Sequence, residues 1–147
     1  MKSIVLGLLL GFMAWQVSAA EGQWMTDFAK AQEKAKKEKK MVLVDFTGSD
    51  WCPPCKALHK NVLSSEEFVS YAKDNLVLVE VDFPHGKPQS AEQKAANKEL
   101  AGKHKIEGYP TVIVFDSNGK ELDKKVGYDG KTTGAEYVAK LKKLKNA

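Results

Sequence analysis

The sequence predicts an α/β domain in which helices flank a central mixed β-sheet. Short apolar runs rich in branched residues, typical of buried strands, alternate with segments whose apolar residues recur every three or four positions, typical of amphipathic helices. The length of 147 residues fits one domain. Apolar residues make up 43% of the chain and charged residues 29%, which excludes a disordered chain, a collagen-like repeat and a multi-pass membrane protein.

The first helix is expected over residues 24–39, where the apolar positions lie three or four residues apart: Trp24, Phe28, Ala31 and Ala35. The short branched run over 41–46 predicts a buried strand. A turn over 47–50 follows. The next helix is expected over 52–63, and its two prolines fall in the first turn, where proline is tolerated.

Polar capping pairs mark the starts of three later helices: the segment Ser64–Glu67, Ser90 with Gln93, and Thr133 with Glu136. The Asn118-Gly119 pair favours a tight hairpin. The remaining elements are expected in this order: a helix to Lys73, a strand over 76–82, a loop over 83–89, a helix ending near Gly102 or Lys105, strands over 111–115 and 121–126, and a helix to Lys145.

The charge pattern argues against a nucleic-acid partner. The chain has 23 basic and 19 acidic residues, a formal net charge of +4. Every basic residue is lysine. Arginine supplies the planar fork that recognises phosphates and base edges with two hydrogen bonds, so its absence from the sequence is not typical of a nucleic-acid reader.

The first residues are typical of a secretory signal peptide. Lys2 precedes an apolar run over 4–14, and small residues follow over 17–20. We expect cleavage after Ala19, with Ala20 as the alternative site, which leaves a domain over 20–147 in the periplasm or outside the cell. The alternative is a membrane anchor, because the 18 uncharged residues over 3–20 reach the lower limit for a span. After cleavage no stable membrane insertion is expected.

Cys52 and Cys55 form a Cys-x-x-Cys pair at the expected start of a helix. Unpaired backbone N–H groups and the helix dipole stabilise a thiolate there, which favours Cys52 as the nucleophile of disulfide exchange. Cys55 lies one turn further and can attack the resulting mixed disulfide. We expect Cys52 to be the more exposed thiol and Cys55 the less accessible one.

Three other uses of the cysteine pair are weaker. A disulfide that closes so short a loop stabilises the fold by only about 2 kcal/mol. Haem attachment requires a histidine directly after the second cysteine, where Lys56 stands. A zinc or copper site needs further ligands, for which the sequence offers three histidines: His59, His85 and His104. Redox chemistry is therefore preferred, without a metal site.

The chain resembles the thioredoxin-fold family. Val44-Asp45-Phe46, leading into Trp51-Cys52-Pro53-Pro54-Cys55-Lys56, is similar to the family's active-site segment. Four further segments are similar to its second half: 106–111, 112–115, Asn118-Gly119 and Val126-Gly127. The resemblance covers residues 40–147 and is strongest to secreted bacterial thioredoxin-like proteins. It implies a thioredoxin fold.

The resemblance also implies roles for single residues. Cys52 would attack and Cys55 would resolve, and Trp51 would cover the rim of the active site. Tyr109-Pro110 matches the place where the family has a cis-proline against the active site, whose backbone pairs with the substrate. A cis bond is therefore expected there, although X–Pro bonds in folded proteins are cis in only about 5–6% of cases.

Asp45 resembles the family's buried acid behind the resolving cysteine. It would accept a proton, and burial would raise its pKa. The alternative is a solvated aspartate at the end of a strand, because the longer turn before Trp51 moves Asp45 one residue further from Cys52. The family's lysine partner for this acid falls at apolar Leu78, so an Asp–Lys relay is not expected.

These inferences predict an exported thiol–disulfide oxidoreductase that acts on protein thiols and disulfides with an upstream membrane or soluble redox partner. Its only redox group would be the Cys52–Cys55 disulfide, without a bound cofactor. Pro53 and Pro54 lack the N–H groups that could stabilise the Cys52 thiolate, which favours reductase or isomerase activity over disulfide insertion. The alternative is a thioredoxin-fold adaptor or metal carrier without turnover.

Overall fold

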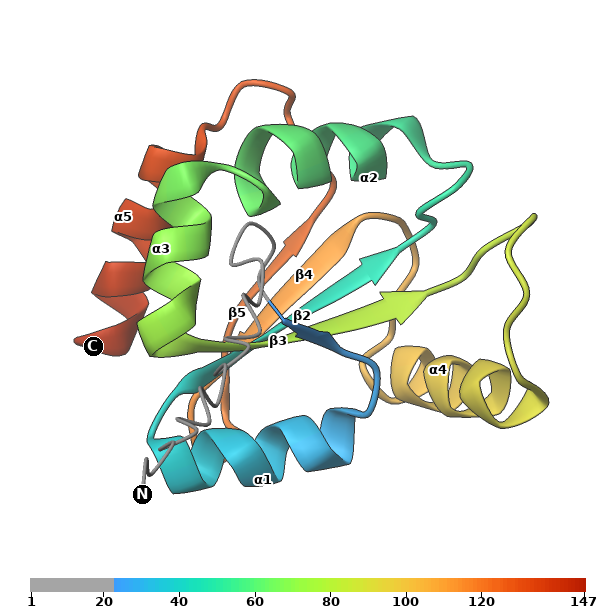
Figure 1. Ribbon diagram of the computed structural model, residues 1–147, viewed down its shortest axis with the longest axis horizontal. Helices are drawn as coiled ribbons and strands as arrows, with labels where there is room; N and C mark the ends of the chain where they lie inside the picture. Colours follow the sequence, from blue (N-terminus) through green and yellow to red (C-terminus); the bar gives the residue numbers. More distant parts are fainter. Residues whose placement is uncertain (1–22) are drawn as a thin grey trace, which may run out of the picture.

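The computed structural model describes residues 23–147 (Figure 1). The predicted signal peptide over residues 1–19 lies outside the described residues. The strands are β1 (Trp24–Met25), β2 (Met41–Thr47), β3 (Leu76–Asp82), β4 (Thr111–Phe115) and β5 (Glu121–Val126). The helices are α1 (Phe28–Glu38), α2 (Pro53–Leu58), the π-helix η1 (His59–Leu63), α3 (Glu66–Asn75), α4 (Ala91–Lys103) and α5 (Gly134–Lys145). Between residues 23 and 147, no helix combines the length and apolar character needed to cross a membrane.

The strands form one mixed sheet in the order β1-β3-β2-β4-β5. The strands β1, β3 and β2 run parallel to one another, whereas β4 is antiparallel to both β2 and β5. Parallel neighbours need a crossover connection, which the segment from α2 to α3 supplies between β2 and β3. The structure confirms the predicted mixed sheet flanked by helices and the thioredoxin fold.

Each face of the sheet is covered by its own set of helices (Figure 1). Because side chains alternate along a strand, neighbouring residues of β2 enter different cores. One core packs against α2, η1, α3 and α5 and includes Leu43, Leu78, Val112, Leu58, Phe68 and Leu141. The other packs against α1 and α4 and includes Val44, Val79, Ile113, Ala31, Ala35 and, partly buried, Leu100. Residue 45 therefore faces the first core, beneath α2.

The predicted start of the first helix is wrong. Trp24 and Met25 form β1, which pairs with Leu78 and Val79 at the edge of β3. Helix α1 begins only after Asp27, whose side chain accepts the N–H of Lys30 (3.1 Å). The open edge of β3 supplies backbone partners for the two residues before this cap, and Trp24 packs on the α3/α5 side of the sheet.

The caps of the later helices are partly as predicted. At α5 both halves of the capping box are present, between Thr133 and Glu136. At α3 the cap is Ser65, whose hydroxyl accepts the N–H of Phe68, so the predicted box over Ser64–Glu67 is wrong in its details. The helix predicted over 52–63 is divided into α2 and η1, and the N–H of Ser64 donates to the carbonyl of His59 (2.8 Å), five residues back.

One edge of the sheet gathers the segments singled out by the sequence. Strands β2 and β3 both end there, at Thr47 and Asp82, and β4 begins there, because Phe46 lies opposite Thr111 in the antiparallel pair. The turn to Cys52, the loop after β3 and the Tyr109-Pro110 peptide therefore meet at the same edge.

Candidate active site

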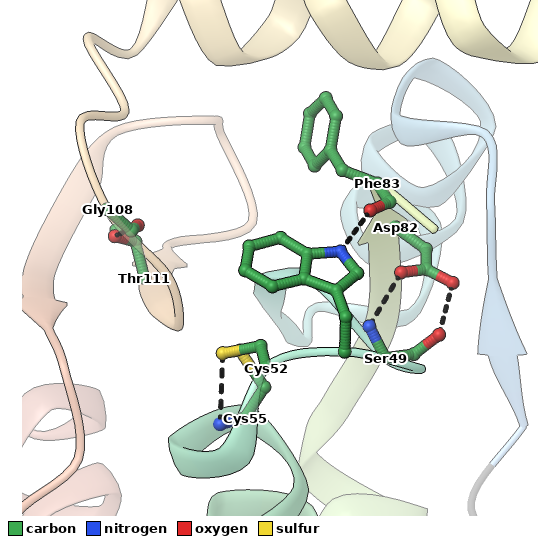
Figure 2. Close-up of a disulfide and its surroundings, with 8 residues drawn as sticks. Ser49, Cys52, Cys55, Asp82, Phe83, Gly108 and Thr111 are labelled. Atoms are coloured by element: carbon green, nitrogen blue, oxygen red, sulfur yellow. Dashed lines mark hydrogen bonds between the residues drawn. A yellow bond between two sulfur atoms is a disulfide. The ribbon is translucent and has the colours of Figure 1, made fainter. Parts of the chain in front are cut away.

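Cys52 and Cys55 are joined by a disulfide at the start of α2 (Figure 2). Cys52 is the residue that caps the helix, and its Sγ accepts the N–H of Cys55 (3.3 Å). Pro53 and Pro54 occupy the first turn, where they leave no N–H of their own to donate. The expected difference in exposure is wrong for this oxidised state, because both cysteines are 3% exposed.

Trp51 forms the rim beside the disulfide, as expected. Its side chain is 38% exposed, and its indole N–H donates to the carbonyl of Phe83 (2.7 Å, Figure 2). The indole stacks on His85, with ring centroids 4.5 Å apart and planes 7° from parallel. A Cβ at Gly48 would overlap the indole ring, so the turn before Trp51 requires glycine there.

Polar contacts tie the turn before Trp51 to the loop after β3. The backbone N–H and the hydroxyl of Ser49 donate to the carboxylate of Asp82 (3.0 and 2.5 Å, Figure 2). Asp50 accepts the N–H groups of His85 (3.0 Å) and Gly86 (2.6 Å). The hydrogen bond from His85, followed by that from Gly86, holds the pKa of Asp50 below its ordinary value. These contacts position the Trp51–His85 stack.

The Tyr109-Pro110 peptide is cis, as the resemblance implied. Tyr109 meets Trp51 edge to face, with ring centroids 5.9 Å apart, so the residues before Cys52 and Pro110 are in contact. Pro110 is buried, and its carbonyl accepts the N–H of Gly127 (2.7 Å). The hydroxyl of Thr111 donates to the carbonyl of Gly108 (2.7 Å, Figure 2), which closes the loop around the proline.

Asp45 is buried, with 5% of its surface exposed, and the solvated alternative is wrong. Strand β2 continues to Thr47, so Asp45 lies inside the strand rather than at its end. Its Oδ1 has no hydrogen-bond partner among the described residues. Burial raises the pKa of Asp45 to about 8, and the negative charges of Glu80 and Asp82 contribute to the same shift.

A cleft of about 260 Å³ lies behind the disulfide and joins Asp45 to Cys55. Its other lining residues are Thr47, Ser49, Lys56, His59, Glu80 and Lys87. The sequence analysis missed Glu80, which lies opposite Asp45 in the pairing of β2 with β3. Leu78, the position expected to face Asp45, instead lies opposite Leu43 in the apolar core.

The three histidines considered as metal ligands lie at separate places. His59 lines the cleft, His85 stacks on Trp51, and His104 packs against the rings of Phe28 and Phe115. Within residues 23–147, no three or more His, Cys, Asp or Glu side chains are grouped so that they could hold a metal ion.

Comparison with known proteins identifies relatives that are thioredoxin-like. A family model described as a thioredoxin-like domain matches residues 28–145. The disulfide bond reductase DsbH of Chlamydia pneumoniae is 39% identical over 126 residues, which cover 86% of this chain and 74% of that protein. The thioredoxin-related protein DsbJ of the same organism is 33% identical over 134 residues, which cover 87% of this chain and 38% of DsbJ.

The structural comparison agrees with the sequence comparison. A solved structure of DsbH oxidoreductase matches with a TM-score of 0.78 at 35% identity and covers 96% of this chain and 95% of its own. The family model spans most of the chain, and DsbH is matched over most of its own length. The chain belongs to the thioredoxin-like family and to the thiol–disulfide oxidoreductases within it.

Proposed function

We propose that this protein exchanges disulfides with other proteins through Cys52 and Cys55, in the direction of reduction or isomerisation. One observation carries the proposal. Cys52, joined to Cys55 by a disulfide, caps a helix, and Asp45 lines the cleft behind Cys55 as a buried carboxyl group whose Oδ1 has no partner among the described residues. A nucleophile, a resolving thiol and a proton acceptor thus belong to one site.

In the proposed reaction, the Cys52 thiolate attacks a substrate disulfide and releases one substrate sulfur as a thiolate. Cys55 then loses its proton to Asp45, in those molecules in which this carboxyl group is ionised, and attacks Cys52 Sγ. The bond between Cys52 and the substrate breaks, and the second substrate sulfur leaves with its electron pair and takes up a proton. The cysteine pair has lost two electrons, and the substrate disulfide has gained them.

Substrate binding is assigned to the rim made by Trp51, Tyr109 and Pro110. The exposed indole offers an apolar surface beside the disulfide, and its contact with Tyr109 joins the two segments that flank the sulfurs. An extended protein segment fits such a surface because its backbone can pair with the backbone beside Pro110. Protein disulfides are therefore the proposed substrate class.

The proposed direction follows from Pro53 and Pro54. A thiolate that receives fewer backbone hydrogen bonds is less stabilised, which makes the disulfide harder to reduce and the reduced protein a better reductant. The related Chlamydia protein bears the name disulfide bond reductase, which agrees with this direction.

We place the protein in the periplasm or outside the cell, because residues 2–20 have a pattern typical of a signal peptide. Disulfide exchange in such a compartment needs an upstream redox partner, membrane-bound or soluble, that restores the reduced cysteines. The proposed enzyme uses its own cysteine pair and no bound cofactor.

An insulin-reduction assay beside a zinc titration of the reduced protein tests the proposal. We expect turnover with dithiothreitol as the reductant and no tight zinc binding. The double variant Cys52→Ser/Cys55→Ser is the control and is expected to be inactive. Tight zinc binding without turnover would favour the metal carrier, and neither property would favour the adaptor.

A further inference from the structure

The structure assigns a second carboxyl group to the cleft behind the disulfide. We propose that Glu80 relays the proton between the buried Asp45 and solvent through the cleft that Lys87 and His59 border. The inference rests on the proposed roles of Cys52, Cys55 and Asp45. Glu80 acts through Asp45 and is in this sense a positioning residue.

Strand pairing places the two carboxyl groups side by side. Asp45 lies opposite Glu80 in the parallel pair of β2 and β3, and neighbouring strands are only about 4.8 Å apart. Alternation along the strands directs both side chains to the face that carries Leu43 and Leu78. Both residues line the cleft that also contains Cys55.

The burial of the two residues differs in the way that a relay requires. Asp45 is 5% exposed, and its Oδ1 has no partner among the described residues, so its contact with bulk water is restricted. Glu80 is only half-buried. His59 and Lys87, which also line the cleft, are exposed. Exposure therefore increases from Asp45 through Glu80 to the two basic residues.

Charged and titratable groups face this pair from every packed element. Asp82 stands on β3, Lys56 on α2, His59 on η1, Lys87 on the loop after β3, and Tyr137 on α5. Burial and then the charge of Asp82 raise the pKa of Glu80, whereas Lys87 and His59 lower it. Asp82 does not line the cleft, and its carboxylate is occupied by Ser49. Glu80 is thus the carboxyl group between Asp45 and the basic residues.

The reaction needs a route by which Asp45 loses its proton in each cycle. When Cys55 attacks Cys52 Sγ, its proton stays on Asp45, and a neutral Asp45 cannot accept the next one. The proton passes from Asp45 to the Glu80 carboxylate and then to water or buffer in the cleft. The reverse transfer returns a proton to Cys55 when the upstream reductant opens the disulfide.

The variant Glu80→Gln tests the relay, because glutamine keeps the size of the side chain and cannot carry the proton. Turnover is measured with a saturating peptide disulfide and dithiothreitol, in dilute buffer and with added imidazole. We expect a rate at least about tenfold lower in dilute buffer, less than the roughly 10²–10⁴-fold effect of a general acid–base group itself. Imidazole should restore the rate of the variant and leave the wild-type rate unchanged.

Asp82→Asn is the matched control, since it removes another negative charge that acts on Asp45 but stands outside the cleft. Both variants should move the pH profile of turnover to lower pH. Only the turnover rate of Glu80→Gln should rise when imidazole is added. If Glu80→Gln fails to fold by circular dichroism, Glu80→Ala is used, with formate as the small acid that fills the space.

Two results would overturn the relay while leaving the proposed function intact. In the first, wild type and Glu80→Gln turn over equally fast in dilute buffer. In the second, the variant is slow and no small acid or base restores it. A wild-type protein without turnover would instead contradict the proposed function itself.

Discussion

Asp45 is a buried carboxyl group that lines a polar cleft, and its Oδ1 has no partner among the described residues. An ionised carboxylate in such a place is strongly destabilised, so the group stays protonated at pH values where an exposed aspartate is charged. Its pKa of about 8 lies close to the ordinary value of a cysteine thiol, about 8.5. Donor and acceptor of comparable pKa exchange a proton in either direction at little cost, which suits a reversible thiol–disulfide reaction.

The raised pKa of Asp45 predicts a pH-dependent stability of the oxidised protein. The folded state holds the proton up to about pH 8, whereas the unfolded state releases it near pH 4. The contribution of Asp45 is therefore fully present below pH 4 and is lost as pH rises to 8, by at most about 1.4 kcal/mol per pH unit. Asp45→Asn should abolish this loss, so the variant gains stability relative to wild type between pH 5 and pH 8.

Urea unfolding at pH 5 and pH 8 measures the free energy of unfolding of both proteins. The effect of burying an amide does not depend on pH, so it cancels when the change between the two pH values is compared. Asp74→Asn, at an exposed position of α3, is the control and should follow the wild-type pH dependence. Parallel pH dependences of Asp45→Asn and wild type would show that Asp45 titrates as an ordinary carboxyl group.

The two cysteines are distinguished by position rather than by exposure. Cys52 caps α2 and accepts a backbone hydrogen bond, whereas Cys55 lies one turn further and lines the same cleft as Asp45. Cys52→Ser should therefore abolish exchange. Cys55→Ser should let Cys52 attack but prevent release, so partner proteins accumulate as mixed disulfides. Non-reducing electrophoresis of the two variants detects such mixed disulfides. If only Cys52→Ser formed them, Cys55 would be the attacking cysteine and Cys52 the releasing one.

Local sequence patterns predict the position of the cysteine pair, but they do not identify every residue of the site. The position of Cys52 at a helix start follows from the Cys-x-x-Cys spacing and the prolines. Asp45 and the cis Pro110 follow only from the family resemblance. Glu80 depends on the register between β2 and β3, and a shift of two residues would have placed Leu78 opposite Asp45.

At the scale of the elements, the long periodic and branched segments could be predicted because their patterns are strong. Strand β3 has the predicted bounds, and β5 was predicted with the bounds that it has. The two-residue strand β1 could not be predicted, since its existence depends on the free edge of β3. The division of the active-site helix into α2 and η1 escaped prediction as well, because helical periodicity does not separate an α-turn from a π-turn.

Contacts with the turn before Trp51 help to hold the loop after β3 in place. Asp50 accepts both His85 and Gly86 N–H groups, and His85 in turn supports Trp51. Asp50→Ala should speed amide exchange at these two residues roughly tenfold or more, because two charge-assisted hydrogen bonds are lost. Insulin reduction should fall as the Trp51 rim loosens.

Asp116→Ala provides the matched control for the Asp50 variant. Asp116 accepts the N–H groups of Asn118 and Lys120 in the turn between β4 and β5. The same kind of contact is removed, but outside the site, so exchange at His85 and activity should not change. Unchanged exchange at His85 and Gly86 in Asp50→Ala would show that the loop is held by other contacts.

At the scale of the whole molecule, the compartment decides whether the disulfide persists. The signal pattern predicts that the full chain, produced in a bacterium with a functional export system, is processed to begin at Ala20. N-terminal sequencing of the exported protein identifies the cleavage site. The double variant Ala19→Lys/Ala20→Lys is the control and should block processing, because it removes the small residues from both expected sites. A wild-type chain that keeps Met1 and stays with the membrane fraction would support the anchor.

The redox potential is also a property of the whole molecule, because it equals the difference in free energy between the complete reduced and oxidised folds. With Pro53 and Pro54 in the first turn of α2, Cys52 Sγ accepts the N–H of Cys55 and lacks two other donors. The reduced fold gains little from its thiolate, so equilibration with glutathione buffers should give a potential nearer to about −270 mV, as in thioredoxin, than to about −120 mV, as in a strong oxidase.

Pro53→His should raise the potential, since it adds a backbone donor and a ring that can carry positive charge beside Cys52. Pro88→His makes the same change in the exposed loop after β3 and should leave the potential unaltered. An oxidase-like wild-type potential, or a Pro53→His variant equal to wild type, would contradict the link between the two prolines and the direction of exchange.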